Sequence, residues 1–457
     1  MTVVTVEELR KRVEASFGQV LDDLVALVRI PSVSADSFDQ TRLHASAEAV
    51  AGLLEGVGVS AVISSAPAPS GKPGRPAVLG RRDGADGAPV VLLYAHHDVQ
   101  PAGELDGWDQ EDPFEPVVRG GRMYARGSAD DKAGVVAHVG ALRVLGDELR
   151  VGVRCFIEGE EEVGSPSFSP FLRQHHADLG ADVIVVLDST NWKVGIPALT
   201  TSLRGLAECQ VEVRVLEHAL HSGMYGGPVI DATTLMCRLL ATLHDENGDL
   251  AVAGLLGREA APVDYPEEDF RADAAVVDGY RLAGTGSLPS RLWTRPAIGI
   301  VGFDATSVAR RSNTIAPTCR AALSLRVAPG QEPAEAYEAL RSHLQAHAPF
   351  GARVTVTPGE LGPAFLAAGE TAMTGLAHWA LTTAWGAQSV EIGVGGSIPF
   401  IADLAREFPD AEILVTGIED PDTRAHSGNE SVHLEELRNA VLAEALLLAR
   451  LSGTLEG

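Results

Sequence analysis

The pattern of apolar and polar positions changes period several times along the first half of the chain. Residues 5 to 30 carry apolar side chains at helical spacing and end at Ile30-Pro31, where proline stops a helix. A second helix is predicted near residues 40 to 57. The run VVLLYAHHD, Val90 to Asp98, is continuously apolar and then abruptly polar. Such a run predicts a strand that is buried on both faces and delivers side chains at its carboxyl end.

Two more apolar runs end in acids in the same way. They are VGVRCFIEGEEE (Val151 to Glu162) and DVIVVLDST (Asp182 to Thr190), and a helix is predicted from Asp131 to Leu145 before them. Strands alternating with helices predict a mostly parallel sheet with helices on both faces, whose ligands bind at the carboxyl edge. The run ILVTGIED, Ile413 to Asp420, predicts another buried strand of this sheet. The stretch 66–89, rich in Ala, Pro and Gly, predicts a surface hairpin or loop.

Near residue 200 the pattern becomes strictly alternating. LAECQVEVRV and CRAALSLRVAP alternate as strands with one wet face do, and helical segments follow each of them. We therefore expect an α/β protein whose catalytic domain, residues 1–199 and 363–457, is interrupted by an inserted α+β domain at residues 200–362. A chain of 457 residues is also too long for one compact core, which agrees with two domains.

Composition limits the classes of binding partner and the compartment that we expect. The 36 Lys and Arg against 62 Asp and Glu give a formal charge of −26, which disfavours nucleic acid and anionic membranes. The N-terminal segment has no basic stretch followed by an apolar one, and no window of about 18 uncharged apolar residues occurs. The four cysteines form no CxxC pair, so we expect buried thiols in a reducing compartment. Together these features predict a cytoplasmic protein.

Imidazoles and carboxylates lie where the predicted strands end. His96, Glu161, Glu162 and Asp188 lie at these ends, whereas Asp130 opens the polar loop SADDK and His426 lies in the glycine-bearing loop AHSGNES. Carboxylates gathered at one sheet edge would repel one another unless cations neutralised them, and one ion seldom balances this many acids. The pattern therefore favours a site for two divalent ions around a shared water.

The order of these motifs resembles the M20 metallopeptidase family, particularly its carnosinase-like dipeptidases. The motifs that carry the resemblance are AHHDVQP, WDQEDPFEP, GRMYARGSADDKAG, EGEEEVGS, ALHSGMYGG, GGSIP and AHSGNES, which span nearly the whole chain. The resemblance implies a hydrolase that cleaves the amide bond of dipeptides or small peptides with two metal ions per subunit. Zinc is the expected metal, with manganese or cobalt as alternatives.

The resemblance also implies roles for the metal-site residues. His96 and Asp188 would bind one ion, Glu162 and His426 the other, and Asp130 would bridge them and precede a non-proline cis peptide bond. Asp98 would orient the His96 imidazole from behind, and Glu161 would be the general base on the bridging water. Because neighbouring side chains on a strand point to opposite faces, His97 should face away from the ions.

Further roles fall in the inserted domain and beside the GGSIP motif. His221 would reach across a dimer interface to stabilise the oxyanion, so the resemblance implies a homodimer with His221 acting in trans and the insert serving as dimerisation or lid domain. The expected substrate-binding residues are Arg326, Asn313, Gly395, Gly396 and Ser397.

One departure from the family leaves the substrate open. Many family dipeptidases carry Arg-Glu just before GGSIP, with the acid near the substrate's amino group, whereas this chain has Gly393-Val394. An N-acyl amino acid amidohydrolase of the desuccinylase or aminoacylase type is therefore an alternative. A non-catalytic metal-binding or peptide-binding homologue is a third. No GxSxG or GxxxxGK[ST] motif occurs, so serine-hydrolase and nucleotide-triphosphatase readings have no support.

Overall fold

The computed structural model describes residues 3–396 and 399–456. The chain divides into two compact units. The first unit contains Met1–Thr200, Ala367–Glu391 and Asp403–Gly457, and the second contains Thr201–Leu366 and Ile392–Ala402. In the described part of the chain, no helix combines the length and apolar composition that crossing a bilayer requires.

The first unit is built on a mixed sheet with a parallel centre. Its strands are β1 (Ser60–Ser64), β2 (Ala77–Arg82), β3 (Val90–His96), β6 (Gly152–Glu158), β7 (Val183–Val186), β17 (Glu412–Val415) and β8 (Ala198–Leu203). Their order is β1-β2-β6-β3-β7-β17-β8, with β15 (Phe365–Leu366) and β16 (Val390–Val394) also pairing with β8. The pairs β6–β3, β3–β7 and β7–β17 are parallel. The parallel α/β architecture predicted from the alternating runs is confirmed.

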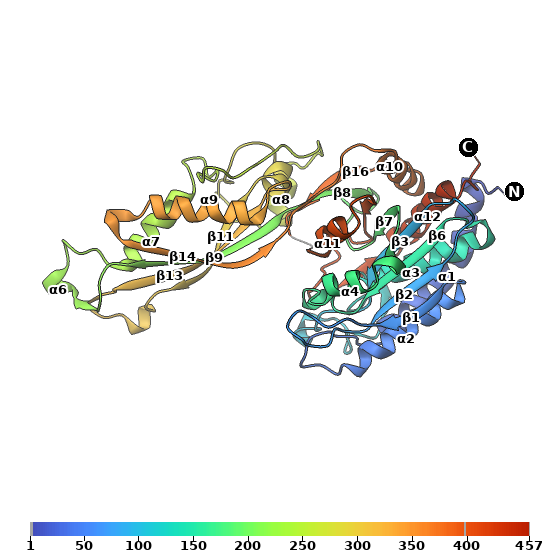
Figure 1. The fold of residues 1–457 in the computed structure, drawn as a ribbon, viewed down its shortest axis with the longest axis horizontal. Coiled ribbons are helices and arrows are strands. Elements are labelled where there is room, and N and C mark those ends of the chain that lie inside the picture. Colours follow the sequence, from blue (N-terminus) through green and yellow to red (C-terminus); the bar gives the residue numbers. More distant parts are fainter. Residues whose placement is uncertain (1–2, 397–398, 457) are drawn as a thin grey trace. The chain divides into compact units, whose positions relative to one another are not determined.

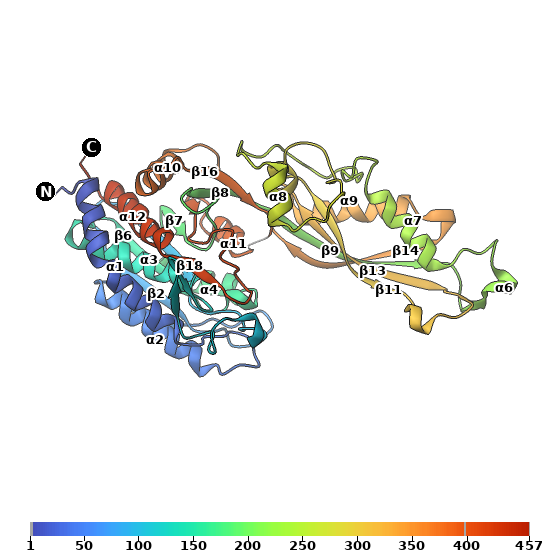
Figure 2. The same cartoon turned by 180° about the vertical axis from the view of Figure 1, so that it is seen from behind.

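Helices cover both faces of this sheet. One face packs on α1 (Val6–Val28), α2 (Thr41–Gly56), α3 (Lys132–Leu145), α10 (Ala372–Trp385) and α12 (Leu434–Leu451). Figure 2 shows α1, α3 and α12 side by side over the strands. Val91, Leu93 and Ala95 point to this face because alternate residues of β3 point the same way.

The other face carries an aromatic cluster. Tyr94 and Phe156, on β3 and β6, meet Phe168 and Phe171 of α4 (Phe168–Gln174), and the rings of Phe156 and Phe171 stack 4.8 Å apart. Helix α5 (His176–Leu179) follows on the same side, and α11 spans Pro399–Glu407. Large buried rings on this face hold the parallel strands in place below their carboxyl ends.

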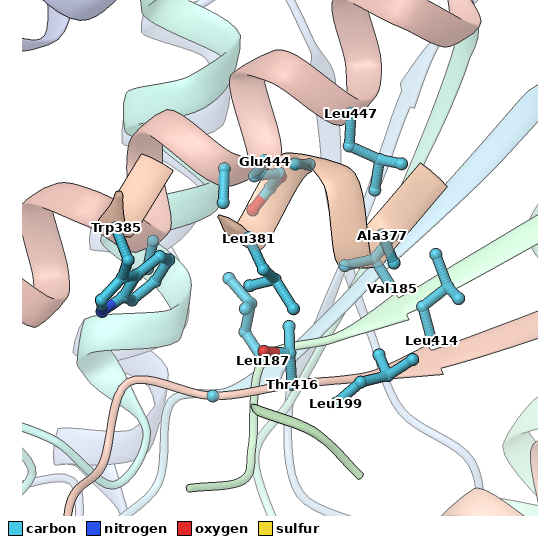
Figure 3. A pocket seen from close by; sticks show the side chains of 14 residues that line it. Val185, Leu187, Leu199, Ala377, Leu381, Trp385, Leu414, Thr416, Glu444 and Leu447 are labelled. Carbon is cyan, nitrogen blue, oxygen red and sulfur yellow. The ribbon is translucent and has the colours of Figure 1, made fainter. Parts of the chain in front are cut away.

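A small apolar cavity lies between the sheet and two of the helices. It measures about 30 Å³ and is walled by residues that include Leu187 of the sheet side, Leu381 and Trp385 of α10, and Leu447 of α12. Figure 3 shows these side chains around it, with Glu444 at its edge. Because the space is small and its walls are apolar, it is a packing defect of the core.

The second unit is a four-stranded antiparallel sheet with helices on one face. Its order is β11-β13-β9-β14, and the strands are β11 (Ala297–Asp304), β13 (Thr318–Val327), β9 (Gly205–Arg214) and β14 (Arg353–Gly362). Its helices are α6 (Ser222–Tyr225), α7 (Ala232–Leu240), α8 (Glu267–Asp273) and α9 (Pro333–Ala346). Figure 1 shows α7 and α9 along this sheet. The short strands β10 (Leu220–His221) and β12 (Thr314–Ile315) pair with each other.

Smaller elements complete the fold, and two predictions were wrong. A third sheet contains β18 (Ser431–His433), β5 (Arg122–Tyr124) and β4 (Val117–Arg119). The stretch 66–89 was expected at the surface, but Ala77–Arg82 forms a strand paired with β6, because Ala77 and Val78 are buried in the core although proline and glycine surround them. Cys237 is exposed, whereas the other three cysteines are buried, and all four are free.

Candidate metal centre

The carboxyl ends of three neighbouring parallel strands carry the candidate ligands. His96 is the last residue of β3, Glu161 and Glu162 follow β6, and Asp188 follows β7. The run of buried apolar residues in each strand fixes where the strand ends, and the parallel pairing brings the three ends to one edge. Asp130 lies just before α3, and His426 lies in the loop between β17 and β18.

One group of possible ligands gathers around His96. Its members are His96, Asp131 and Asp188, whose donor atoms all lie within 4.8 Å of one another. His96 Nε2 is 3.8 Å from Asp188 Oδ1, and the backbone N–H of His96 donates to Asp131 Oδ2 at 3.1 Å. The imidazole is fully buried, so its orientation is fixed by the surrounding core.

A second group gathers around His426. Its members are Asp130, Glu162 and His426, again within 4.8 Å. His426 Nε2 lies 3.0 Å from both Asp130 Oδ2 and Glu162 Oε2. The other oxygen of Asp130, Oδ1, lies 3.0 Å from His96 Nε2. The two oxygens of Asp130 therefore face the two groups, and the peptide bond that follows Asp130 is cis.

Asp98 supports both groups from behind. Its Oδ1 lies 3.4 Å from His96 Nδ1, and its two oxygens accept the backbone N–H groups of Glu161 and Glu162 at 3.2 and 3.1 Å. His97 points the other way, with Nε2 2.9 Å from the carbonyl of Pro76, and burial lowers its pKa to about 4. The prediction that only one of the two histidines faces the site is confirmed.

The site concentrates negative charge in a buried place. Burial raises the pKa of Asp131 and of Asp188 well above the usual range, and neighbouring carboxylates add to the increase. Burial would also raise the pKa of Asp130, but hydrogen bonding with His426 and His96 outweighs it and lowers that pKa. Hydrogen bonding to Asp130 and Glu162 raises the pKa of His426 to about 11. Burial thus disfavours the charged form of these acids, and bound cations would neutralise them.

The donor set fits two divalent ions. Each group offers one imidazole and two carboxylates, the ligand types that zinc and related ions bind, and Asp130 belongs to one group while touching the other. The crowding of buried acids also gives two cations a physical reason to bind, because burial and mutual repulsion both raise the carboxyl pKa values and bound cations would offset both effects.

Glu161 lies beside these groups, and its side chain forms no hydrogen bond or ion pair with any residue that the structure describes. Burial raises its pKa to about 8, the His96 charge lowers it, and Glu162 and Asp130 raise it further. A carboxyl group with a pKa near neutrality can accept and return a proton at physiological pH, which is what general acid and base catalysis requires.

Three acids at the site were missed from the sequence. Asp131 lies within ligand distance of His96, Glu419 follows β17, and the buried Glu430 accepts backbone N–H groups beside Asp130. Burial together with Asp130 and Glu430 raises the pKa of Glu419 well above its usual range. Glu419 had a detectable signal, since it ends the apolar run ILVTGIED just as the other acids end theirs.

The predicted residues of the second unit fall in two places. His221 on β10 pairs with Thr314, and the carbonyl of Asn313 accepts the N–H of Ser222 at 3.0 Å, so His221 and Asn313 are neighbours. Arg326 lies near the opposite end of β13, about 26 Å along the strand from Thr318 at 3.3 Å per residue. Figure 1 shows α6, which directly follows His221, at one end of this sheet.

The glycine motif lies in the second unit as well. Gly395 and Gly396 form a bend directly after β16 and are half-buried. Ser397 lies outside the described residues. A Cβ at Gly393 would come within 2.5 Å of Trp293 Cβ. This close packing explains why glycine occupies position 393, one of the two positions at which the chain departs from the family pattern.

Comparison with known proteins shows the family to which the chain belongs. The model of peptidase family M20/M25/M40 matches residues 92–450. The chain is 37% identical over 384 residues to the cysteinylglycine-S-conjugate dipeptidase of Corynebacterium striatum, covering 81% of this chain and 83% of that protein. The crystal structure of human carnosine dipeptidase 1 superposes with a TM-score of 0.77 at 21% identity and covers 99% of this chain and 100% of that one.

A more distant structure shares the fold. The Bacillus subtilis YXEP protein, described as a dinuclear metal binding peptidase from the M20 family, gives a TM-score of 0.59 at 14% identity, covering 96% of this chain and 99% of that one. The family model covers well over half of the sequence, including every candidate ligand described above. The chain therefore belongs to peptidase family M20/M25/M40.

Proposed function

We propose that this chain, a metal-dependent dipeptidase of the M20 family, cleaves the amide bond of dipeptides or small peptides with two divalent ions and with Glu161 as general base. One observation carries the proposal. Two groups of imidazole and carboxylate donors lie at one sheet edge, and the two oxygens of Asp130 face one group each. Such an arrangement suits a pair of ions that share a bridging carboxylate.

The ligand assignment that the family resemblance implies is supported by these contacts. His96 and Asp188 would hold one ion, Glu162 and His426 the other, and Asp130 would bridge them. Zinc is favoured because it suits the imidazole nitrogens, and manganese or cobalt is the alternative because the site is rich in carboxylates. When bound, two divalent ions lower the pKa of water and polarise a carbonyl group.

The protein's own residues move the proton and fix the geometry. Glu161 takes a proton from the attacking water and passes it to the leaving amine. Asp98 holds the His96 imidazole in one orientation, and it also fixes the backbone of Glu161 through the hydrogen bond to its N–H. Glu161 and Glu162 are adjacent in sequence, but Glu161 acts as the base and Glu162 as a ligand.

The substrate class follows from family membership and from one relative. The Corynebacterium striatum relative is named for cysteinylglycine S-conjugates, so S-substituted Cys-Gly dipeptides are the first substrates to assay. The Gly393-Val394 departure supports the alternative of an N-acyl amino acid, because Val394 provides no carboxylate to bind a free amino group. A non-catalytic binding protein is the third candidate.

An assay of chelated and reconstituted protein separates these candidates. The protein is stripped with a chelator, reloaded with zinc, manganese or cobalt, and assayed on free dipeptides, S-substituted Cys-Gly and N-acyl amino acids. We expect cleavage of free dipeptides only after reloading. Cleavage of blocked substrates alone would assign the N-acyl alternative, undiminished activity after stripping would exclude metal catalysis, and no cleavage with intact metal binding would indicate a binding protein.

We further propose a homodimer in which His221 acts in trans, with the inserted domain of residues 200–362 as the dimerisation or lid domain. Two features support the proposal. His221 and Arg326 lie near opposite ends of β13, so one chain cannot bring both to one small substrate. The edge strand β11 exposes Ile300 by 53% and Val301 by 65%, an apolar edge suited to pairing.

Mixing two inactive variants tests the trans role. Neither His221→Ala nor Glu161→Ala should be active alone, whereas an equimolar mixture that exchanges subunits at random should recover about a quarter of wild-type activity, because half of the dimers are mixed and one of their two sites is intact. No recovery in a mixture that demonstrably exchanges subunits would exclude action in trans. Sedimentation of Ile300→Lys tests the edge, and a dimer unaffected by that charge would exclude β11 as the interface.

The free cysteines support a reducing compartment, and we propose the cytoplasm. The strongly negative charge agrees with small-molecule substrates rather than nucleic acid or an anionic membrane surface.

A further inference from the structure

Arg204 is a buried arginine in the second unit whose guanidinium is held by carbonyl groups alone. It is only 9% exposed. Its Nε donates to the carbonyl of Gly395 at 3.0 Å, and Nη1 donates to the carbonyl of Arg295 at 3.4 Å. Within residues 3–396 and 399–456, no carboxylate forms an ion pair with Arg204, and its Nη2 donates no hydrogen bond. A buried charge without a counter-ion is costly, so this position calls for an explanation.

Other buried arginines of the chain have acidic partners. Arg126 pairs with Glu430, and Arg122 pairs with Asp420 at 2.8 Å. Arg154, as exposed as Arg204, lies 3.7 Å from Asp83. The chain carries 26 more acidic than basic side chains, so a partner for Arg204 was available in its composition. The missing acid is therefore a feature of this place in the fold.

A second arginine without a partner lies beside it. Arg326 on β13 is the Cα partner of Leu206, two residues after Arg204, so the two arginines are diagonal neighbours on one face of the sheet. That face is opposite to the one that packs on α7 and α9. Arg326 forms no hydrogen bond or ion pair with the residues that the structure describes. Burial and the charge of Arg326 both lower the pKa of Arg204, to about 10.

The glycine bend after β16 completes the surroundings. A Cβ at Gly395 would lie 2.7 Å from Arg204 Nη2, so only glycine lets the backbone pass this close to the guanidinium. The N–H of Arg204 also donates to the carbonyl of Val394 at 3.2 Å. Arg204 is thus fixed between the bend and the sheet, with the donor groups of Nη2 left over.

We propose that Arg204 and Arg326 together form a carboxylate site, in which Arg204 is a substrate-binding residue and the ligand is the free C-terminal carboxylate of a peptide. Two neighbouring guanidiniums without acidic partners offer the parallel N–H groups that a carboxylate binds in bidentate fashion. The bound anion also relieves the repulsion between them. The inference rests on the proposed peptidase function, and it adds Arg204 to a role that the family resemblance implied for Arg326 alone.

Paired substrates test the site. Kinetics are measured on a dipeptide with a free C-terminal carboxylate and on the same dipeptide as its C-terminal amide. We expect wild-type protein to prefer the free acid. Arg204→Gln should raise KM for the acid by about tenfold to a hundredfold, the worth of a hydrogen bond to a charged group, and leave KM for the amide nearly unchanged. Arg204→Lys keeps the charge and should recover part of the preference.

The control is Arg320→Gln, because Arg320 lies on the same face of β13 but is exposed and paired with Glu212. It should leave the preference for the acid intact. If Arg204→Gln lowers kcat/KM equally for acid and amide, Arg204 only supports the bend at Gly395 and the carboxylate site is refuted. Equal use of acid and amide by the wild type refutes it as well, while leaving the peptidase function in place.

Direct binding separates failure of the site from failure of the proposed function. Calorimetric titration of the metal-loaded protein with N-acetylglycine and with N-acetylglycinamide needs no turnover. We expect the acid to bind more tightly than the amide, and Arg204→Gln, but not Arg320→Gln, to abolish the difference. Should the protein cleave no dipeptide, this result would still decide the carboxylate site. A difference that survives in Arg204→Gln would overturn it.

Discussion

The backbone N–H of Asp130 donates a hydrogen bond of 3.2 Å to the side chain of Glu430, which lies 300 residues later in the chain. The same carboxylate accepts the N–H groups of Ala129 at 3.1 Å and Gly127 at 3.0 Å, and it pairs with the buried Arg126. Glu430 therefore fixes the whole turn that presents Asp130 to both groups of the metal centre. A carboxylate suits this task because every group hydrogen-bonded to it is a donor.

Replacing Glu430 with Gln should weaken binding of divalent ions by about tenfold to a hundredfold, as loss of a residue that supports a ligand generally does. The amide can accept from fewer of the N–H groups, so Asp130 loses its fixed position. Calorimetric titration with zinc measures the change, and Glu435→Gln on the exposed start of α12 is the control. Unchanged zinc affinity in a folded Glu430→Gln protein would show that Asp130 does not need this support.

Glu161→Ala should keep its metal and lose turnover by about a hundredfold or more, because it would remove the proposed general base without removing a proposed ligand. Metal content by elemental analysis and kcat on a free dipeptide measure the two effects separately. The matched variant Asp188→Asn should lose metal, since Asp188 lies in the His96 group. Metal loss from Glu161→Ala would instead make Glu161 a ligand.

Removing His138 should change how stability depends on pH. His138 is buried with Nδ1 2.8 Å from Glu444; burial lowers its pKa, but the Glu444 carboxylate outweighs burial and the net pKa is raised. The folded state therefore holds the proton more tightly than the unfolded state. The stability that the pair contributes is complete below the ordinary value of 6.5 and is lost as pH rises through the raised value.

Urea unfolding at a series of pH values measures this contribution. The difference in unfolding free energy between wild type and His138→Gln should be largest at pH 6 and shrink steadily above it. His218→Gln, at an exposed position, should give a small difference that does not change with pH. A difference for His138→Gln that grows with pH would mean that the buried histidine is neutral in the folded protein.

Leu381→Ala should destabilise the first unit by about 2 to 5 kcal/mol, because it enlarges the apolar cavity shown in Figure 3 and removes buried methyl groups. Leu361→Ala, at a position that is 42% exposed, is the matched control and should cost far less. Thermal and urea unfolding measure both. Equal effects of the two substitutions would show that the wall of the cavity relaxes around the smaller side chain.

Local patterns predicted the elements that local physics decides. The apolar runs predicted where β3, β6 and β7 begin to within one residue, because a strand buried on both faces tolerates few polar side chains. The Ala77–Arg82 strand was missed because the glycines and prolines on either side give the signal of a loop, while its burial depends on α2 and β6. Composition around a segment does not report what packs on it.

By itself the sequence determined which residues could form a metal centre and in what order, since His96, Glu162 and Asp188 end apolar runs and Asp130 and His426 lie in recognisable polar motifs. Only the tertiary structure decided that Asp131 lies within reach of His96, that Glu430 holds Asp130, and that Arg204 has no acidic partner among the described residues. These relationships join residues that are far apart in the chain or depend on what is absent around a side chain. Periodicity records the burial of a position along one element, whereas the partners of a charge are set by packing between elements.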